Sequence, residues 1–370
     1  MKARGRQFHG WTRRSLLCGL AGMTLPAAAQ NRASLPTEAV RFTDPATEAS
    51  VIRLTSPEHS SSLPPYSSDA AGRSGASLVY SSDRTGVWQV YRMDLKTGQS
   101  QQLTEANALD TSSVCQLFDE RSICYFDGPS LRQTVLSTLR TREVYRVPEG
   151  WSHGRGLCLS GDGVNATFVE VGERVWRLRI LGLAKGDAAT AAEAPEAIGD
   201  PIPRPRRAGI LYRRGQDALW LVNYDGRDNR CLKTTAGGLG PADWSPDGRS
   251  VLYLRFPLEP DKLNEIREHV PDSNSDQLIS TTSQFVSFNH NSDASVFVGS
   301  SSSKASPYIL ILLRVTHREL ALCEHRSSDP TSVAPVFSAD SQKVYFQSDR
   351  HGKPAIYTIR VDRLVEKTET

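Results

Sequence analysis

Two pairs of arginines and one histidine are candidate ligand-binding side chains of this sequence. The pairs are Arg206–Arg207 and Arg213–Arg214, and the histidine is His153, which follows Glu149-Gly150-Trp151. A guanidinium group presents a planar fork of N–H donors that matches a carboxylate in a bidentate manner. The alternative for each of these residues is a structural or solvated position, and the sequence alone leaves both open.

The sequence contains no Gly-x-Ser-x-Gly, paired-cysteine or phosphate-loop motif, which removes the common signatures of a serine hydrolase, a zinc site and a nucleotide site. Outside the first 29 residues the odd number and irregular spacing of the cysteines fit no disulfide framework. These cysteines are Cys115, Cys124, Cys158, Cys231 and Cys323. Cys115 and Cys124 flank an expected hairpin turn, so the sequence leaves open whether they form a disulfide or remain buried thiols.

Residues 1–29 are expected to form a twin-arginine signal peptide. Thr12-Arg13-Arg14-Ser15-Leu16-Leu17 precedes an apolar run and the small-residue stretch Ala27-Ala28-Ala29. Export by this route predicts a periplasmic or secreted protein. Removal of these residues takes away five basic and no acidic side chains, so the formal charge falls from +3 to about −2. The sequence therefore predicts no nucleic-acid partner, and it contains no apolar run long enough to span a membrane.

The elements that would position these side chains are short strands in a repeated unit. Leu78–Thr104 contains three strand-like runs, separated by turns at Asp83–Gly86 and Asp94–Gly98, where Gly86 and Gly98 suit a positive φ. A similar unit returns at Val344–Asp362. Such internal repetition is typical of propellers and solenoids.

One short sequence pattern marks the same point of each repeat, where an inner strand ends in a tight turn. Its clearest form is Trp244-Ser245-Pro246-Asp247-Gly248 before an apolar strand. Variants of it fall near residues 67, 118, 160, 203, 245, 292 and 338, with spacings close to the size of a four-stranded propeller blade. We therefore expect an all-β fold with residues 30–370 forming one seven-bladed β-propeller. The last unit lacks a strand, and Ser50–Thr55 is expected to supply it and close the ring.

Two segments interrupt the repeat pattern. The Ala- and Pro-rich stretch from Leu183 to Pro205 is expected to be a surface loop between blades. The charged stretch from Pro257 to Asp276 is expected to be an insertion with a short helix over Lys262–Arg267. Neither segment contains a recognisable catalytic pattern.

The order of these phrases resembles the oligogalacturonate lyases, a family of seven-bladed propellers that cleave short pectin fragments. The matching phrases cover nearly the whole chain after the signal peptide. They are Asp44–Thr47 with Val51–Thr55, Tyr91–Gly98, Val144–Trp151, Leu219–Gly226 and Ser348–Tyr357. Part of this likeness is shared with TolB-like propellers in general.

The resemblance implies β-elimination on a uronide, which needs a base and a cation to stabilise an enolate-like charge. The family holds a manganese-type metal on three histidines and a glutamine, and places a histidine and an arginine for catalysis. Alignment by eye assigns the metal positions to Ser287, Asp329, Ser332 and Ala334, the catalytic histidine near Pro241 and the arginine near Ala218. All six are substituted, so we expect no metal cofactor and can assign no catalytic residue.

We therefore expect a divergent family member that binds an acidic oligosaccharide of the pectin-derived oligogalacturonide class on its channel face. Arg206–Arg207 and Arg213–Arg214 are the basic pairs nearest the strands that face substrate in the family, and His153 is a further candidate. Two alternatives stay open. One is a TolB-like propeller that binds a protein partner, and the other is an active lyase with a rebuilt site.

Overall fold

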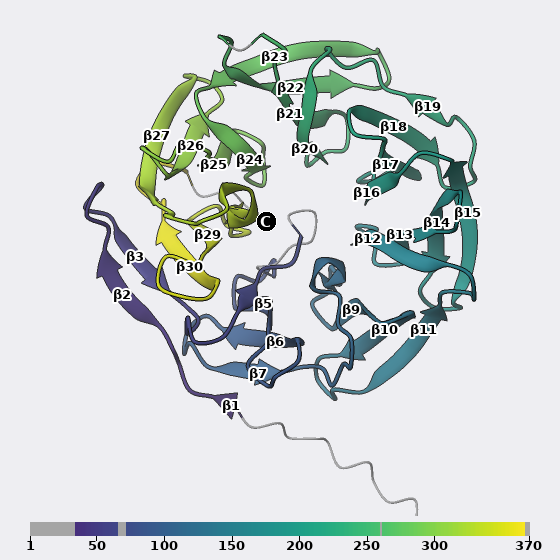
Figure 1. Cartoon of the computed structure of the whole chain (residues 1–370), viewed down its shortest axis with the longest axis horizontal. Helices are drawn as coiled ribbons and strands as arrows, with labels where there is room; N and C mark the ends of the chain where they lie inside the picture. Colours follow the sequence, from purple (N-terminus) through teal and green to yellow (C-terminus); the bar gives the residue numbers. More distant parts are fainter. Residues whose placement is uncertain (1–33, 66–71, 260, 367–370) are drawn as a thin grey trace, which may run out of the picture. The chain divides into compact units, whose positions relative to one another are not determined.

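The structure is a computed structural model that describes residues 34–65, 72–259 and 261–366. These residues form seven antiparallel sheets arranged as blades around a central axis, which Figure 1 shows end-on. The expected seven-bladed β-propeller is therefore confirmed. The predicted signal peptide lies outside the described residues and stays a prediction. Within the described ranges, no helix has the length and apolar character needed to cross a membrane.

Each blade is built from the inner strand outward, in chain order. The first three blades contain β4 (Ser61–Ser62), β5 (Ser77–Ser82), β6 (Gln89–Asp94) and β7 (Ser100–Gln102); β8 (Cys115–Gln116), β9 (Ser122–Asp127), β10 (Ser130–Val135) and β11 (Thr141–Arg146); and β12 (Ser152–Leu159), β13 (Asn165–Val171), β14 (Trp176–Gly182) and β15 (Asp187–Ala194). Two short 3-10 helices, η1 (Thr111–Ser113) and η2 (Pro330–Val333), precede the inner strands of the second and seventh blades.

The remaining blades follow the same plan. They contain β16 (Ile198–Pro203), β17 (Gly209–Arg214), β18 (Ala218–Asn223) and β19 (Arg230–Cys231); β20 (Gly238–Trp244), β21 (Val251–Phe256), β22 (Asn264–Val270) and β23 (Ser275–Thr282); β24 (Phe285–His290), β25 (Val296–Ser301), β26 (Tyr308–Leu313) and β27 (Arg318–Glu324); and β28 (Val336–Phe337), β29 (Lys343–Ser348) and β30 (Ala355–Arg360).

The N-terminal segment closes the ring, as the sequence predicts. Its strand β3 (Ser50–Arg53) pairs with β30, with Val51 opposite Ile359, and supplies the fourth strand of the seventh blade. Two strands extend this closure beyond the prediction. β2 (Val40–Thr43) pairs with the outer side of β3, and β1 (Ser34–Leu35) pairs with β7 of the first blade. One segment thus ties together the first and last blades.

The repeated Ser-x-Asp phrase is a hydrogen-bonded turn at the end of an inner strand. In the fifth blade the Ser245 hydroxyl donates to the Asp247 carboxylate at 2.8 Å and accepts from the Ser250 amide at 3.0 Å. The third and seventh blades repeat both bonds, from Ser160 and Ser338. Gly248 has a φ of +68°, and a Cβ there would lie 2.4 Å from a backbone oxygen, so this turn requires glycine.

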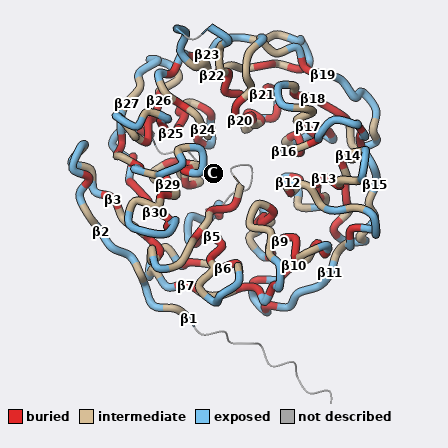
Figure 2. Tube along the Cα trace, viewed as in Figure 1, coloured by how far each residue is buried: buried red, intermediate tan, exposed pale blue. Residues whose placement is uncertain are grey.

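The hydrophobic core consists of seven clusters, one between each pair of neighbouring blades. At the closing seam, Tyr345 and Ile356 of the seventh blade pack against Leu78 and Tyr80 of the first. Figure 2 shows the buried residues within and between the blades and the exposed ones around the rim. Each large apolar side chain buried in this way contributes about 1.5–3 kcal/mol, so the blades stabilise one another.

The predicted loop from Leu183 to Pro205 is wrong, because this segment forms β15 and β16. The small side chains of Ala191, Ala192 and Ala194 fit the narrow interface between the third and fourth blades. Proline is tolerated in β16 because this strand is the inner edge of its blade, where one side of the backbone needs no N–H donor.

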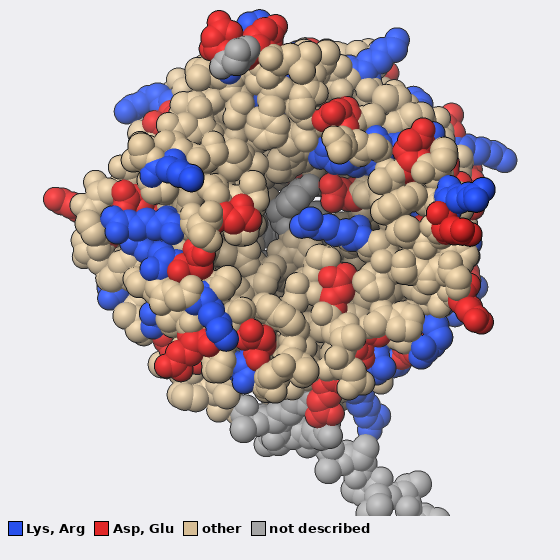
Figure 3. All heavy atoms as spheres, viewed as in Figure 1, with Lys and Arg blue, Asp and Glu red and all other residues tan. Residues whose placement is uncertain are grey.

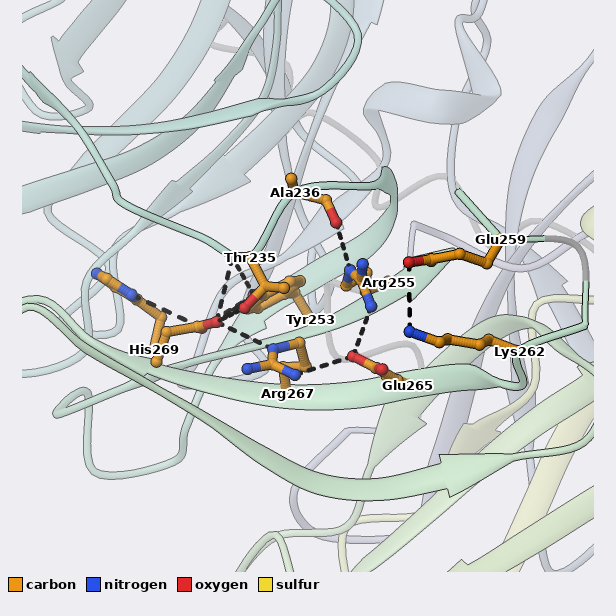
Figure 4. A network of polar contacts seen from close by, with 10 residues as sticks. Thr235, Ala236, Tyr253, Arg255, Glu259, Lys262, Glu265, Arg267 and His269 are labelled. Atoms are coloured by element: carbon orange, nitrogen blue, oxygen red, sulfur yellow. Dashed lines mark hydrogen bonds and ion pairs between the residues drawn. The ribbon is translucent and has the colours of Figure 1, made fainter. Parts of the chain in front are cut away.

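The predicted helix over Lys262–Arg267 is also wrong, because these residues enter β22. Figure 4 shows why a charged segment is stable there as a strand: its side chains form ion pairs with neighbouring strands. Glu265 accepts from Arg255 and from Arg267, both at 2.9 Å, and Arg267 also donates to Asp276 at 2.9 Å. These tertiary contacts override a local preference for helix.

Candidate ligand-binding site

A cavity of about 510 Å³ lies on the propeller axis, at the end where the inner strands begin. Figure 3 shows charged side chains of both signs beside the central opening of the ring. Irregular pairing in four consecutive inner strands, β12, β16, β20 and β24, builds much of the wall. Residues at these bulges that line the cavity are Arg155, Gly156, Asp200, Pro201, Pro241 and Val286. A bulge turns side chains out of the regular alternation, and bulges recur beside functional sites.

Most polar side chains of the cavity wall are already engaged in hydrogen bonds. Gln347 accepts from the Leu63 amide at 2.7 Å and donates to the Ser332 carbonyl at 2.8 Å. The hydroxyls of Thr331 and Ser112 donate to the aspartates that cap η2 and η1. Leucines, prolines, Ile202, Val286 and Phe288 supply the remaining, apolar surface. Such a cavity offers a ligand an apolar enclosure and few free polar groups.

Four of the six family positions meet in this cavity. Pro241, Ser287, Ser332 and Ala334 line it, whereas Asp329 caps η2 and Ala218 begins β18. The alignment by eye therefore brings the expected region of the chain to the axis.

The side chains at the metal positions do not fit a manganese-type ion. The Ser287 hydroxyl lies 2.5 Å from the Ser300 hydroxyl, and the Ser332 hydroxyl donates to the Asp329 carbonyl at 2.8 Å. The Asp329 carboxylate accepts from the Thr331 amide at 2.9 Å, and Ala334 has no ligating atom. Across the residues that the structure describes, no three His, Cys, Asp or Glu side chains are grouped to hold a metal. We assign no metal-dependent step to this site.

His290, which lies beside the position of Ser287 in the sequence, is committed to the backbone. Its Nδ1 is 2.8 Å from the Asn291 carbonyl oxygen and its Nε2 is 3.0 Å from the Trp244 carbonyl oxygen. Neither ring nitrogen is left to bind a metal.

Among the predicted binding residues, Arg213 lines the cavity, but its guanidinium is occupied. Its nitrogens donate to the carbonyls of Gln216, Leu239 and Gly240 at 2.8, 3.1 and 2.7 Å, and Nε is 3.3 Å from the Asp200 carboxylate. These contacts link the fourth blade to the fifth. Arg213 therefore acts in the structure as a tie between blades.

The other predicted arginines do not line the cavity. Arg214 donates to Glu196 at 2.7 Å and lies over the Trp220 ring. Arg206 and Arg207 are exposed in the turn at the far end of the β16–β17 hairpin, and Arg207 pairs with Asp272 at 2.7 Å. The two arginine pairs thus lie at opposite ends of β17 and do not converge on one ligand.

His153 lies beside the cavity without lining it. Its ring stacks on Phe126 with a centroid distance of 4.3 Å, and its Nδ1 is 3.6 Å from the carboxylate of Asp110. Asp110 caps η1 by accepting from the Ser112 amide at 2.9 Å. His153 therefore helps to support η1, which carries Thr111 and Ser112 into the wall.

Arg155 is the functional candidate that the sequence analysis missed. It lines the cavity, is exposed, and has no hydrogen bond or ion pair with any residue that the structure describes. The only sequence signal was the pair of flanking glycines, Gly154 and Gly156, which indicates an irregular strand. In the sequence, an isolated arginine between two glycines is a weaker indication of a binding residue than a pair of adjacent arginines.

The chain is similar to proteins described as oligogalacturonate lyases. A family model described as oligogalacturonate lyase matches residues 30–180. The oligogalacturonide lyase of Pectobacterium atrosepticum and the oligogalacturonate lyase of Dickeya dadantii are each 24% identical to this chain, over 86% of it and 95% of their own length.

Two solved structures of oligogalacturonate lyases have the same fold as this chain. An oligogalacturonate lyase in complex with manganese superposes with a TM-score of 0.84 at 23% identity, over 89% of this chain and 98% of that one. The oligogalacturonate lyase of Vibrio parahaemolyticus gives a TM-score of 0.83 with the same coverage. The solved structures show the fold, and the family model and the curated relatives show that the chain is similar to the oligogalacturonate lyases.

Proposed function

We propose that this chain is an exported, non-catalytic member of the oligogalacturonate lyase family that binds a pectin-derived oligogalacturonide in the central cavity. One observation carries the proposal: the cavity retains an unpaired arginine, Arg155, while the positions aligned with the metal ligands hold Ser287, Asp329, Ser332 and Ala334. A site with these groups can recognise a carboxylate but has no means to stabilise an enolate-like charge through a metal.

The second requirement of β-elimination, a base at the reacting carbon, is also unmet in the cavity wall. Among the described residues of the wall, Asp200 is the one carboxylate and faces Arg213 at 3.3 Å, and none is a histidine. A general base must reach the proton that it abstracts. The arrangement therefore favours binding over cleavage.

The N-terminal sequence supports the part of the proposal that concerns export. The twin-arginine pattern at Thr12–Leu17 and the small residues at Ala27–Ala29 are typical of a signal peptide for the periplasm or the exterior. Pectin fragments generated outside the cell would meet the protein there.

A lyase assay on the purified mature chain tests the proposal. Short oligogalacturonates are incubated with the protein, with manganese or with chelator, and the absorbance of the unsaturated product is followed. We expect no product, together with binding of the same ligands in calorimetry. Metal-dependent product would overturn the non-catalytic assignment, and the absence of both product and binding would overturn the ligand assignment.

One observation favours a protein partner as the second candidate. Leu258 and Leu263, in the connection between β21 and β22, are 76% and 50% exposed. An exposed apolar patch is a feature of contact sites between proteins, and these two leucines are the candidates for such a patch. A protein that co-purifies with the wild type and is lost with the double variant Leu258→Ser/Leu263→Ser would support this candidate.

A further inference from the structure

We propose that Arg155 is the carboxylate-binding residue of the cavity and that the bulge in β12 presents it to a single carboxylate of the ligand. This inference rests on the proposed function, because it names the contact by which the cavity recognises an oligogalacturonide. It also limits that recognition to one uronide unit.

The bulge in β12 is unusually wide. His153 lies opposite Glu170 and Leu157 lies opposite Phe168, so the three residues from Gly154 to Gly156 face the single residue Val169. The extra residues leave the regular pleat and move the intervening side chain off the ladder. Arg155, at the centre of the bulge, is exposed and lines the cavity.

The glycines on both sides of Arg155 are closely packed, and Gly156 also has a positive φ. A Cβ at Gly154 would lie 3.1 Å from a Val169 methyl group. Gly156 has a φ of +96°, and a Cβ there would lie 3.1 Å from the Pro201 ring of the next blade. The backbone on either side of Arg155 is therefore packed tightly, while the side chain itself is left without a partner. This combination fixes the base of the side chain and leaves its charged end free.

The second arginine of the wall cannot take this role. Arg213 gives its N–H groups to three backbone carbonyls and the Asp200 carboxylate. Turning it toward a ligand would break these bonds. Arg155 is thus the one cation of the described cavity wall that can form a bidentate pair with a carboxylate at no such cost.

One free cation implies recognition of one carboxylate. The Thr111 hydroxyl, which also lines the cavity and has no hydrogen bond to a described residue, is available to a neighbouring sugar hydroxyl. Further uronide units would meet proline and leucine surface and an Asp200 carboxylate that is already paired with Arg213, so no second cation of the described wall is available to them. We therefore infer that affinity depends strongly on one carboxylate and only weakly on chain length.

Calorimetry on the full mature chain tests this inference with a matched pair of ligands, trigalacturonate and its fully methyl-esterified form. The wild-type protein is expected to prefer the free acid. Arg155→Gln is expected to bind the free acid about 10- to 100-fold more weakly, from loss of a charge-assisted contact, and to bind the ester unchanged. Arg206→Gln, which removes an exposed arginine at the far end of the hairpin, is the control and is expected to bind like the wild type.

The outcomes separate the inference from the function on which it rests. If the wild type binds trigalacturonate and Arg155→Gln binds it equally well, the role of Arg155 is overturned and the proposed function stands. If the wild type binds neither trigalacturonate nor galacturonate, the proposed function itself fails. A trigalacturonate affinity more than about 100-fold above that of galacturonate would overturn recognition of a single carboxylate.

Discussion

The ion-pair network of the fifth blade and the central cavity use the same kinds of side chain in opposite ways. In the network, drawn in Figure 4, Arg255 and Arg267 are each bonded to a carboxylate and are nearly buried. In the cavity, Arg155 has no partner among the described residues and is exposed. A charge that neighbours satisfy stabilises the fold, and one that the fold leaves unsatisfied is available to a ligand. The residue type alone does not distinguish a charge that stabilises the fold from one that is available to a ligand.

Asp276 is the acceptor at the centre of the network, and its loss should have the largest effect. Its carboxylate accepts from the Tyr253 hydroxyl at 2.9 Å, the Thr235 hydroxyl at 2.5 Å and Arg267 at 2.9 Å. Asp276→Asn should lower the free energy of unfolding by about 3–5 kcal/mol, because it leaves the nearly buried Arg267 short of a counter-charge. Urea unfolding measures this loss.

Asp261→Asn is the control for that measurement, because Asp261 is exposed in the neighbouring connection. It should change the free energy of unfolding by no more than about 0.5 kcal/mol. An equal loss in both variants would mean that the network stabilises the fold no more than an ordinary surface charge does.

The two arginines of the cavity wall allow an arginine that is bonded within the protein to be compared with an unpaired one in the same site. Arg213→Gln removes donors to three carbonyls and should lower the free energy of unfolding by about 1–3 kcal/mol. Arg155→Gln removes no contact with a described residue and should change it by less than about 0.5 kcal/mol. Thermal and urea unfolding of both variants, beside the wild type, provide the measurement. A large loss of stability in Arg155→Gln would show that this side chain is structural.

His269 is the member of the fifth-blade network whose partners are incomplete. It is fully buried, neither ring nitrogen has a hydrogen-bond partner among the described residues, and Nδ1 is 3.8 Å from Asp276. Burial lowers the pKa of His269 below its usual 6.5, against the opposing charge of Asp276. Below pH 6.5 the unfolded chain therefore binds a proton that the folded chain resists, and stability is lost as the pH falls toward the folded pKa.

His269→Leu should remove this part of the acid sensitivity. Between pH 8 and pH 5 the variant should lose less stability than the wild type, by at most about 1.4 kcal/mol for each pH unit below 6.5. His317→Asn, at an exposed histidine, should leave the pH dependence unchanged. Denaturant unfolding at both pH values tests the pair, and parallel curves for the wild type and His269→Leu would contradict the prediction.

The fold could be predicted from the sequence because each repeat is marked by residues that form a local hydrogen-bonded turn. Ser245, Asp247 and Gly248 each have a fixed place in the turn, so the phase of the blades follows from residue types a few positions apart. The errors arose where tertiary contacts override local preference. The charged strand β22 and the alanine-rich strand β15 are stabilised by neighbouring strands and blades.

The site was harder to predict, because it depends on which side chains remain unpaired after folding. The arginine pairs at Arg206–Arg207 and Arg213–Arg214 are conspicuous in the sequence, but their partners come from residues up to 65 positions away. The role of Arg155 depends on a bulge whose width is set by pairing with β13. Neither the partners nor the bulge can be read from local spacing.

The smallest effect is expected from manganese, the metal bound by an oligogalacturonate lyase of similar structure. A site whose dissociation constant for the metal is about 100-fold below the metal concentration used would stabilise the folded chain by about 2.7 kcal/mol. Here Ser287 and Ser332 are bonded within the protein and Ala334 has no donor atom, so manganese should leave the unfolding midpoint unchanged. Thermal unfolding with manganese and with chelator measures the shift. An increase that chelator reverses would mean that other groups of this chain form a metal site, and the non-catalytic assignment would fall with it.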